Sequence, residues 1–376
     1  MENQYFRLEE SIHNFQSGVG KMELFYLIDT FCPIIYNNTE KYEVSDTNIP
    51  IDKNLIEKTV EDFFRELNLL DEYLNNIHLK EKNRFIGTDT LEIEVEQRKK
   101  ELNELLSANE LSKEIYDLAI EMEDENLKEH INVVTDDGKL IVTLTGTIED
   151  IYLIVHESIH KIYHQPSIEN DFFKDISTGF NQIFLVEVSS IIAELMLKDY
   201  LEREKIGVET SEHIRMRFNN TREELAKFHF EMILTKIYNK YHKITDKLID
   251  EELLKEEEPL QTDLMQKKQF YIKYFSYPVY PLPYIFGTIA ACSLKEKVLN
   301  QPEILNYIGK SIYDNNIEEV LQYLGINFVE SYETIEENQF GGCKKTNYKL
   351  NEEKRLEMLE NYFGEYNKLF TQKRLK

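Results

Sequence analysis

One pentapeptide constrains the local structure and chemistry of this chain more than any other feature: His156-Glu157-Ser158-Ile159-His160. In a helix, residues i and i+4 lie one turn apart on the same face, so both imidazoles can reach one tetrahedral metal ion. Glu157 follows the first histidine directly, where a carboxylate can act as general base toward a metal-bound water. The motif therefore predicts a helix in which His156 and His160 bind zinc and Glu157 is the catalytic base.

A β-hairpin is predicted just before this helix. Residues 131–135 and 140–145 are runs rich in β-branched side chains, and Asp136-Asp137-Gly138 between them is a hairpin turn signal. A hairpin is unusual in a chain whose other patterns are helical, so we expect it to serve the site that follows.

The start of the motif helix is marked by Thr147-x-x-Asp150, a capping box, and the helix is expected to run to about Tyr163. Two roles for Asp150 stay open. It can close the helix N-terminus, or it can accept a hydrogen bond from a metal-bound histidine, as carboxylates do in many zinc sites.

A zinc site with one position left for water needs a third protein ligand. The apolar run at 184–195 predicts a buried helix that starts near Gln182 and carries Glu187 and Glu194 on one stripe. A carboxylate in such a run needs a cation or a metal as partner unless it faces solvent. Both acids are therefore candidates for the site, while Ser190 between them can simply hydrogen-bond the preceding turn.

Three stretches of the chain carry a family resemblance. They are Leu144-Thr145-Gly146-Thr147 with Asp150 ahead of the motif, Val186-Glu187-Val188-Ser189-Ser190 with Glu194, and the tyrosine-rich run 277–291. Together they resemble the thimet oligopeptidase and oligoendopeptidase F family of zinc peptidases, and oligoendopeptidase F in particular. The likeness continues through Tyr323-Leu324-Gly325-Ile326, and it covers about residues 130–330.

The resemblance implies a mainly α, zincin-type (gluzincin) metallopeptidase fold, with a small β-hairpin or sheet beside the motif helix and a deep substrate cleft. It also implies that the strand at 140–145 pairs with the backbone of the substrate, which would set the peptide register without requiring particular side chains.

The resemblance further implies residue roles. Glu187, 27 residues after His160, matches the family's third zinc ligand. Tyr280 and Tyr284 match tyrosines that hydrogen-bond the oxyanion, and Tyr277 is a weaker match. The alternative for any one of the 23 tyrosines is a structural role.

The chain departs from the family pattern at several positions. Ile159 replaces a glycine, and Tyr163 stands where the family has a histidine, so that the neighbouring His164 is expected to be structural or at the rim of the site. Tyr274 replaces a histidine ahead of the tyrosine-rich run. The N-terminal part is also shorter than in the family, which predicts a more open cleft.

The rest of the chain is predicted to be helical. Residues 55–78 have apolar side chains at spacings of three and four, which indicates one amphipathic helix, and residues 91–128 predict one or two charged helices. We expect a helical N-terminal part over 1–130 and a zinc catalytic domain over 131–376, or one continuous domain around a cleft.

The charge composition limits the kinds of partner that the protein is expected to bind. The 70 acidic and 44 basic residues give a net charge of −26, which disfavours nucleic acid and anionic membranes and favours basic peptides. No apolar run is long enough to span a bilayer, and Met1–Tyr5 does not begin a secretory signal. Cys32, Cys292 and Cys343 are far apart and odd in number, so we expect reduced thiols and a cytoplasmic location.

The sequence thus predicts a metalloendopeptidase that uses one Zn²⁺ to hydrolyse peptide bonds in oligopeptides. Two alternatives stay open: a toxin-like zinc protease dedicated to one protein substrate, and an inactive peptide-binding homologue. Retention of Glu157 argues against the second, because a binding module has no need of a general base. Nothing in the sequence indicates the oligomeric state.

Overall fold

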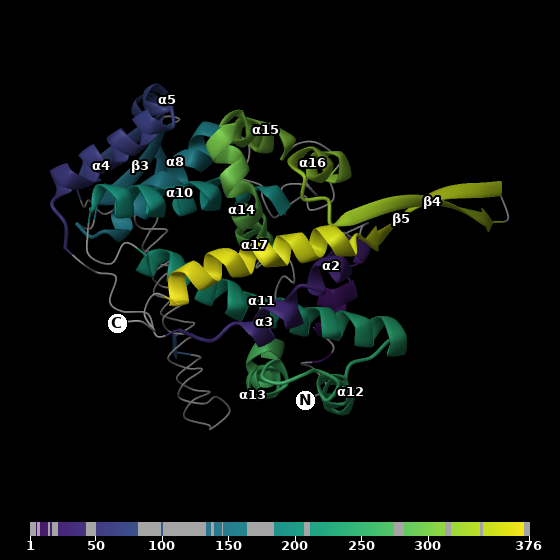
Figure 1. Ribbon diagram of the computed structural model, residues 1–376. Coiled ribbons are helices and arrows are strands. Elements are labelled where there is room, and N and C mark those ends of the chain that lie inside the picture. The colour runs from purple at the N-terminus through teal and green to yellow at the C-terminus, as the bar shows by residue number, and fades with distance from the viewer. Residues whose placement is uncertain are drawn as a thin grey trace.

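The computed structural model describes residues 5, 8–13, 16, 22–42, 50–81, 99–100, 133–136, 139–144, 146–163, 184–206, 211–273, 282–312, 317–338 and 341–371 of the 376. This part of the chain is mainly helical, as predicted, with two small sheets (Figure 1). The helices are α2 (Met22–Asp29), α3 (Cys32–Asn38), α4 (Lys53–Glu66), α5 (Leu70–Asn76), α8 (Glu149–Tyr163), α10 (Val188–Glu204), α11 (Glu212–Tyr241), α12 (Asp246–Leu253), α13 (Leu260–Lys273), α14 (Leu282–Asn300), α15 (Glu303–Ser311), α16 (Ile317–Leu324) and α17 (Glu352–Thr371). The strands are β1 (Ile77–Glu81), β2 (Val133–Asp136), β3 (Lys139–Leu144), β4 (Val329–Asn338) and β5 (Gly341–Leu350).

The predicted hairpin before the motif helix is confirmed. Strands β2 and β3 pair antiparallel with Asp136 opposite Lys139, so residues 137 and 138 of the Asp-Gly signal connect the two strands. The predicted helix that follows is also confirmed, because α8 begins at Glu149 and ends at Tyr163.

The predicted single helix at 55–78 is wrong. The segment divides into α4 and α5 at Asn68, whose φ of 57° is left-handed, and Ile77 already belongs to β1. Strand β1 pairs in parallel with β3, which adds a third strand to the hairpin. Of the predicted helices at 91–128, only residues 99 and 100 are described, and both are helical.

The sheet order restricts the expected role of the strand at 140–145. β3 lies in the middle, with β1 on one side and β2 on the other. Over Leu140–Val142 both edges of β3 are occupied, so this stretch cannot add a peptide strand. Among the described residues, the edges without a partner strand are the outer sides of β1 and β2 and the β2 side of β3 at residues 143–144.

The helices around the sheet form one packed body. Helix α10 packs against both α8 and α14, and α11 packs against α3, α13 and α14. In Figure 1 the sheet lies with α4, α5, α8 and α10, while α11 to α13 and α3 form the lower part and α17 crosses in front. The main buried cluster includes Ile28 and Phe64 as well as Ile154, Leu195 and Phe286. The core thus contains side chains from both sides of residue 130, which itself lies outside the described residues.

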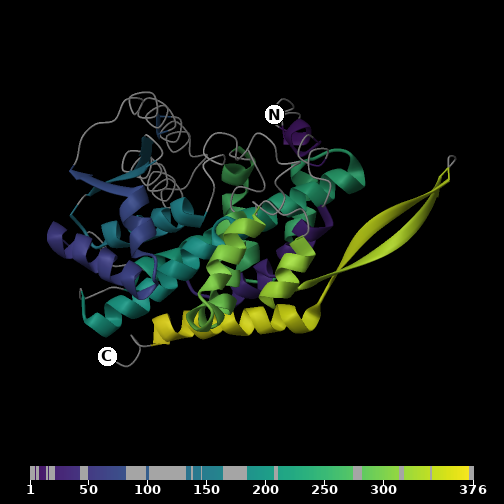
Figure 2. The same ribbon diagram turned by 90° about the horizontal axis from the view of Figure 1, so that it is seen from above.

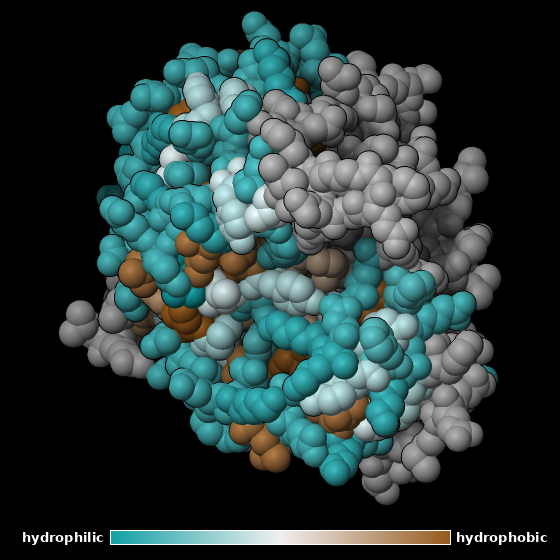
Figure 3. Space-filling model, turned by 90° about the vertical axis from the view of Figure 1, so that its right-hand side faces the viewer, coloured by the Kyte–Doolittle hydropathy of each residue, from teal (hydrophilic) through white to brown (hydrophobic). Residues whose placement is uncertain are grey.

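The hairpin of β4 and β5 was not expected from the sequence. It projects beyond the helical body as a two-stranded ribbon, which both ribbon views show (Figures 1 and 2). The face from which it projects is mainly hydrophilic, with small apolar groups between polar side chains (Figure 3).

Two further expectations concern the environment of the protein. None of the helices in the described ranges combines the length and the apolar character needed to cross a bilayer. Cys32 and Cys292 are both buried and form no disulfide, while the side chain of Cys343 lies outside the described residues.

Candidate metal centre

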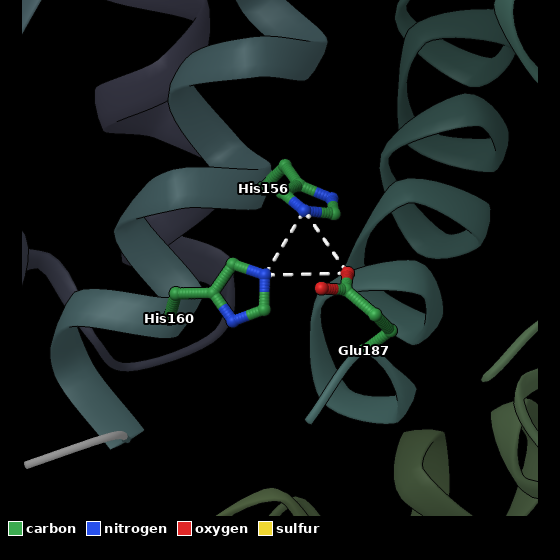
Figure 4. A group of neighbouring side chains, drawn as sticks. All are labelled: His156, His160 and Glu187. Carbon is green, nitrogen blue, oxygen red and sulfur yellow. Dashed lines mark hydrogen bonds and ion pairs between the residues drawn. The ribbon is translucent and has the colours of Figure 1, made fainter. Parts of the chain in front are cut away.

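The structure brings His156, His160 and Glu187 together. Their donor atoms form a triangle: the two Nε2 atoms lie 3.0 Å apart, and Glu187 Oε2 lies 3.3 Å from each of them. Figure 4 shows the two imidazoles on α8 and the carboxylate on the neighbouring α10, all pointing toward one another. Among the described residues, these three are the group of histidine and acidic side chains that can hold one metal ion.

The donor set and its spacing fit zinc. Two ligands about 2.0–2.1 Å from a tetrahedral Zn²⁺ lie about 3.3 Å from each other, and the triangle has edges of 3.0–3.3 Å. Two imidazole nitrogens and one carboxylate oxygen form a set typical of catalytic zinc sites, which leave a fourth position to water.

Helix α8 presents its histidines because its opposite face is anchored in the core. Ile151, Ile154, Val155 and Ile159 are all fully buried, which fixes the rotation of the helix about its axis. Ile159, where the resembled family has glycine, therefore packs into the protein interior. Glu157 is half-buried and directly follows the first ligand.

Glu187 lies at the N-cap of α10, so that helix begins later than the sequence predicts. Its carboxylate is buried and lies 3.3 Å from the hydroxyl of Ser190, which donates to the Glu187 carbonyl at 3.0 Å. Gly287 on α14 packs directly against this position: a Cβ there would lie 2.8 Å from Ile191 Cδ1 and 3.0 Å from Glu187 Cβ. The absence of a side chain at Gly287 thus allows α14 to approach the ligand closely.

Glu194 contacts the His156 ring at Nδ1, the nitrogen that does not belong to the donor triangle. Its Oε1 lies 2.5 Å from His156 Nδ1. A carboxylate can only accept a hydrogen bond, so Nδ1 carries the proton and the lone pair of Nε2 faces the triangle. Of the two roles considered for Glu194, the structure therefore supports contact with the ligand and not exposure to solvent, since this residue is 1% exposed.

The pKa values of His156 and Glu194 are both shifted in the direction that favours a positive charge between the two carboxylates. Burial opposes the charged form of His156, but hydrogen bonds to Glu187 and Glu194 raise its pKa well above the ordinary value. Burial likewise opposes the ionised form of Glu194, yet Arg217 and His156 hold the pKa of its carboxyl well below the usual range. The carboxylates thus stay ionised and surround the imidazole with negative charge.

Two residues of α11 that the sequence did not indicate complete this network. Arg217 Nε donates to Glu194 Oε2 at 3.0 Å, and its Nη2 donates to Oε1. His213 lies with Nδ1 2.6 Å from Glu149 Oε2, and its Nε2 is 3.5 Å from Glu194. They come from a helix well beyond the motif, so no local pattern connects them with it.

The structure favours the capping role of Asp150. Its Oδ2 accepts hydrogen bonds from the backbone N–H groups of Gly146 at 2.7 Å and of Thr147 at 3.4 Å. The bond to the Thr147 N–H is the half of the capping box that the acidic residue supplies, and the bond to Gly146 adds to it at the start of the motif helix.

Of the tyrosines predicted to hydrogen-bond the oxyanion, only Tyr284 lies within the described residues. Tyr284 lies in the first turn of α14, with the Arg217 guanidinium 6.0 Å from its ring centroid. Tyr280, Tyr277 and Tyr274 lie outside the described residues, as does His164.

The three donors are arranged so that they could hold one divalent cation. Glu157, the residue after His156, supplies a carboxylate of suitable chemistry for proton transfer. Comparison of the chain with protein-family models, curated proteins and solved structures finds no match.

Proposed function

We propose that this protein is a zinc-dependent endopeptidase that hydrolyses peptide bonds in oligopeptides, and that its fold is of the gluzincin type. The observation that supports this most strongly is the donor triangle of His156, His160 and Glu187 at near-zinc spacing. Glu157 directly follows His156 in the sequence. This combination is typical of metal-assisted hydrolysis.

In the proposed site, His156, His160 and Glu187 hold the metal. Zinc, when bound, supplies a Lewis acid that polarises the scissile carbonyl and lowers the pKa of water. Glu157 accepts a proton from the water that attacks the carbonyl carbon. When the C–N bond breaks, it donates that proton to the leaving amine nitrogen, which balances the hydrolysis.

A tyrosine hydroxyl is proposed to donate to the carbonyl oxygen as negative charge develops there. Tyr284 is one candidate, since the ring contact with Arg217 ties the first turn of α14 to the network behind His156. Tyr280 remains the other candidate, on the resemblance alone.

We further propose that the substrates are basic peptides. The net charge of −26 would attract cationic chains and speed their encounter with the protein at low salt. The same charge is why we expect no nucleic-acid partner.

The test is the replacement Glu157→Gln. The parent protein should bind one equivalent of Zn²⁺ and cleave a library of short unstructured peptides. Glu157→Gln should bind zinc as the parent does, because this residue is not a ligand, but cleave the peptides at least about 10²-fold more slowly. Glu202→Gln, a half-exposed acid toward the other end of α10, is the matched control and should cleave at the parent rate.

The outcomes separate the alternatives. Equal cleavage by the parent and Glu157→Gln would contradict the mechanism. Zinc binding without cleavage of any peptide in the library would favour a protease dedicated to one protein substrate, and stoichiometric zinc absent from the parent would contradict the metal centre.

A further inference from the structure

The carboxylate of Glu194 stands at the centre of a buried network that connects three helices. It is 1% exposed and accepts from His156 on α8 and from Arg217 on α11, while the residue itself belongs to α10. Rotation of this carboxylate would change the direction of its bond to the His156 imidazole. Whatever fixes its orientation therefore also fixes the aim of Nε2 at the metal position.

Arg217 fixes the orientation of the Glu194 carboxylate through two hydrogen bonds. Its guanidinium donates through Nε to one oxygen of Glu194 and through Nη2 to the other. Two parallel bonds from a planar fork hold both the position and the plane of a carboxylate, which a single ammonium cannot do. Oε1, which also receives the bond from His156, is thereby held in place.

The helix that carries Arg217 is itself firmly placed. α11 has 30 residues and packs against α3, α13 and α14. One turn before Arg217, His213 bonds to Glu149 in the first turn of α8 and stacks on Tyr152, with ring centroids 4.0 Å apart. The first two turns of α11 thus hold the motif helix near its start and, through Glu194, at its first ligand.

We propose that Arg217 is a positioning residue of the metal centre: through Glu194 it sets the orientation of His156 and thereby the affinity of the site for zinc. This inference rests on the proposed function, because it presupposes that His156 is a zinc ligand. The hydrogen bonds of Arg217 to this network go to Glu194, and Glu187 interacts with Arg217 only through electrostatic attraction, so Arg217 acts on His156 through Glu194.

The experiment measures the zinc affinity of the full chain by competition with a chromogenic chelator, with no peptide present. Arg217→Lys keeps the positive charge but loses the two parallel N–H donors of the guanidinium. It should weaken Zn²⁺ binding by about 10- to 100-fold, the loss typical when a partner behind a ligand is removed. The absorption spectrum of the Co²⁺-loaded variant should also differ from that of the parent, because the ligand geometry changes.

Arg215→Lys is the matched control. Arg215 lies two residues away on α11 and likewise bonds a buried carboxylate, that of Glu212, but it has no contact with the metal network. Arg215→Lys should bind Zn²⁺ within about twofold of the parent. Thermal unfolding of both variants in chelator shows whether they lose similar stability in the absence of metal.

A double-mutant cycle decides whether Arg217 acts through Glu194, and it also serves if Arg217→Lys does not fold. In a Glu194→Gln background, which removes the buried charge, Arg217→Met should cause no further loss of zinc affinity. A further loss in that background would overturn the proposal, as would a folded Arg217→Lys that binds zinc as tightly as the parent. A parent that binds no zinc would overturn the proposed function as well. A parent that binds zinc without cleaving peptides would overturn the proposed function alone.

Discussion

Gly287→Ala tests how closely α14 must approach Glu187, the proposed metal ligand. The added Cβ would lie 2.8 Å from Ile191 Cδ1, 3.0 Å from Glu187 Cβ and 3.3 Å from the Glu187 carbonyl carbon. The isoleucine methyl ends a side chain that can rotate, but the two Glu187 atoms can move only with the backbone. We therefore expect the substitution to shift the start of α10 and, with it, the Glu187 carboxylate.

The magnitude follows from two opposing effects. Replacing glycine by alanine inside a helix gains about 1 kcal/mol of helix propensity, whereas overpacking of this kind costs about 1–3 kcal/mol. The net change ranges from none to a loss of about 2 kcal/mol. Gly364 in α17 is the matched control, because nothing lies within 4 Å of a Cβ built there. Gly364→Ala should show the propensity gain alone.

The assay is chemical denaturation of the metal-free proteins, followed by zinc titration. Gly287→Ala should be less stable than Gly364→Ala by about 1–3 kcal/mol and should bind zinc more weakly than the parent. If Gly287→Ala were stabilised as much as Gly364→Ala and bound zinc normally, the close approach of α14 to Glu187 would have no role in the site.

Three further outcomes are expected. Asp150→Ala should cost about 1 kcal/mol of unfolding free energy, because the side-chain acceptor for the Gly146 N–H is lost, and should leave zinc affinity unchanged; a large loss of affinity would contradict the capping role. Burial opposes the charge on His229, but Asp29 and Glu256 raise its pKa from 6.5 to about 9. Its stabilisation, on the order of 3 kcal/mol, is thus complete below pH 6.5 and lost as the pH rises through 9. Denaturation midpoints of the parent should show this fall, and the fall should be smaller in His229→Gln. The fall that remains in the variant belongs to groups such as His213, where burial opposes the charge but Glu149 and Glu194 likewise raise the pKa to about 9. Zinc at 100 times its dissociation constant should raise the unfolding free energy by about 2.7 kcal/mol, a gain that chelator abolishes and magnesium does not reproduce.

Local signals predicted local structure correctly. The histidines at i and i+4 require only a helix to face one side, and the Asp-Gly turn and the capping box act within a few residues. That is why α8 and the β2–β3 hairpin could be predicted with their boundaries nearly correct. Glu187 and Glu194 could both be named as candidates because an acid in an apolar run needs a partner, and the family resemblance indicated Glu187 as the ligand.

Two errors show where local patterns fail. The residues from Ile77 onward form β1 because they pair in parallel with β3, some 60 positions later, and this distant partner outweighs the helical pattern that precedes them. Strands β4 and β5 carry charged or polar residues along most of their length, so they lack the alternation that marks a strand with one buried face.

The sequence by itself determined which residues can bind a metal and which helix carries two of them, because spacing along a helix is a property of adjacent turns. Only the tertiary structure decided that Glu187 completes the triangle, that Glu194 lies behind His156, and that Arg217 holds Glu194. These contacts join α8, α10 and α11, and they depend on how the buried faces of the three helices pack. Packing is set by the whole core, so no single segment of the chain encodes it.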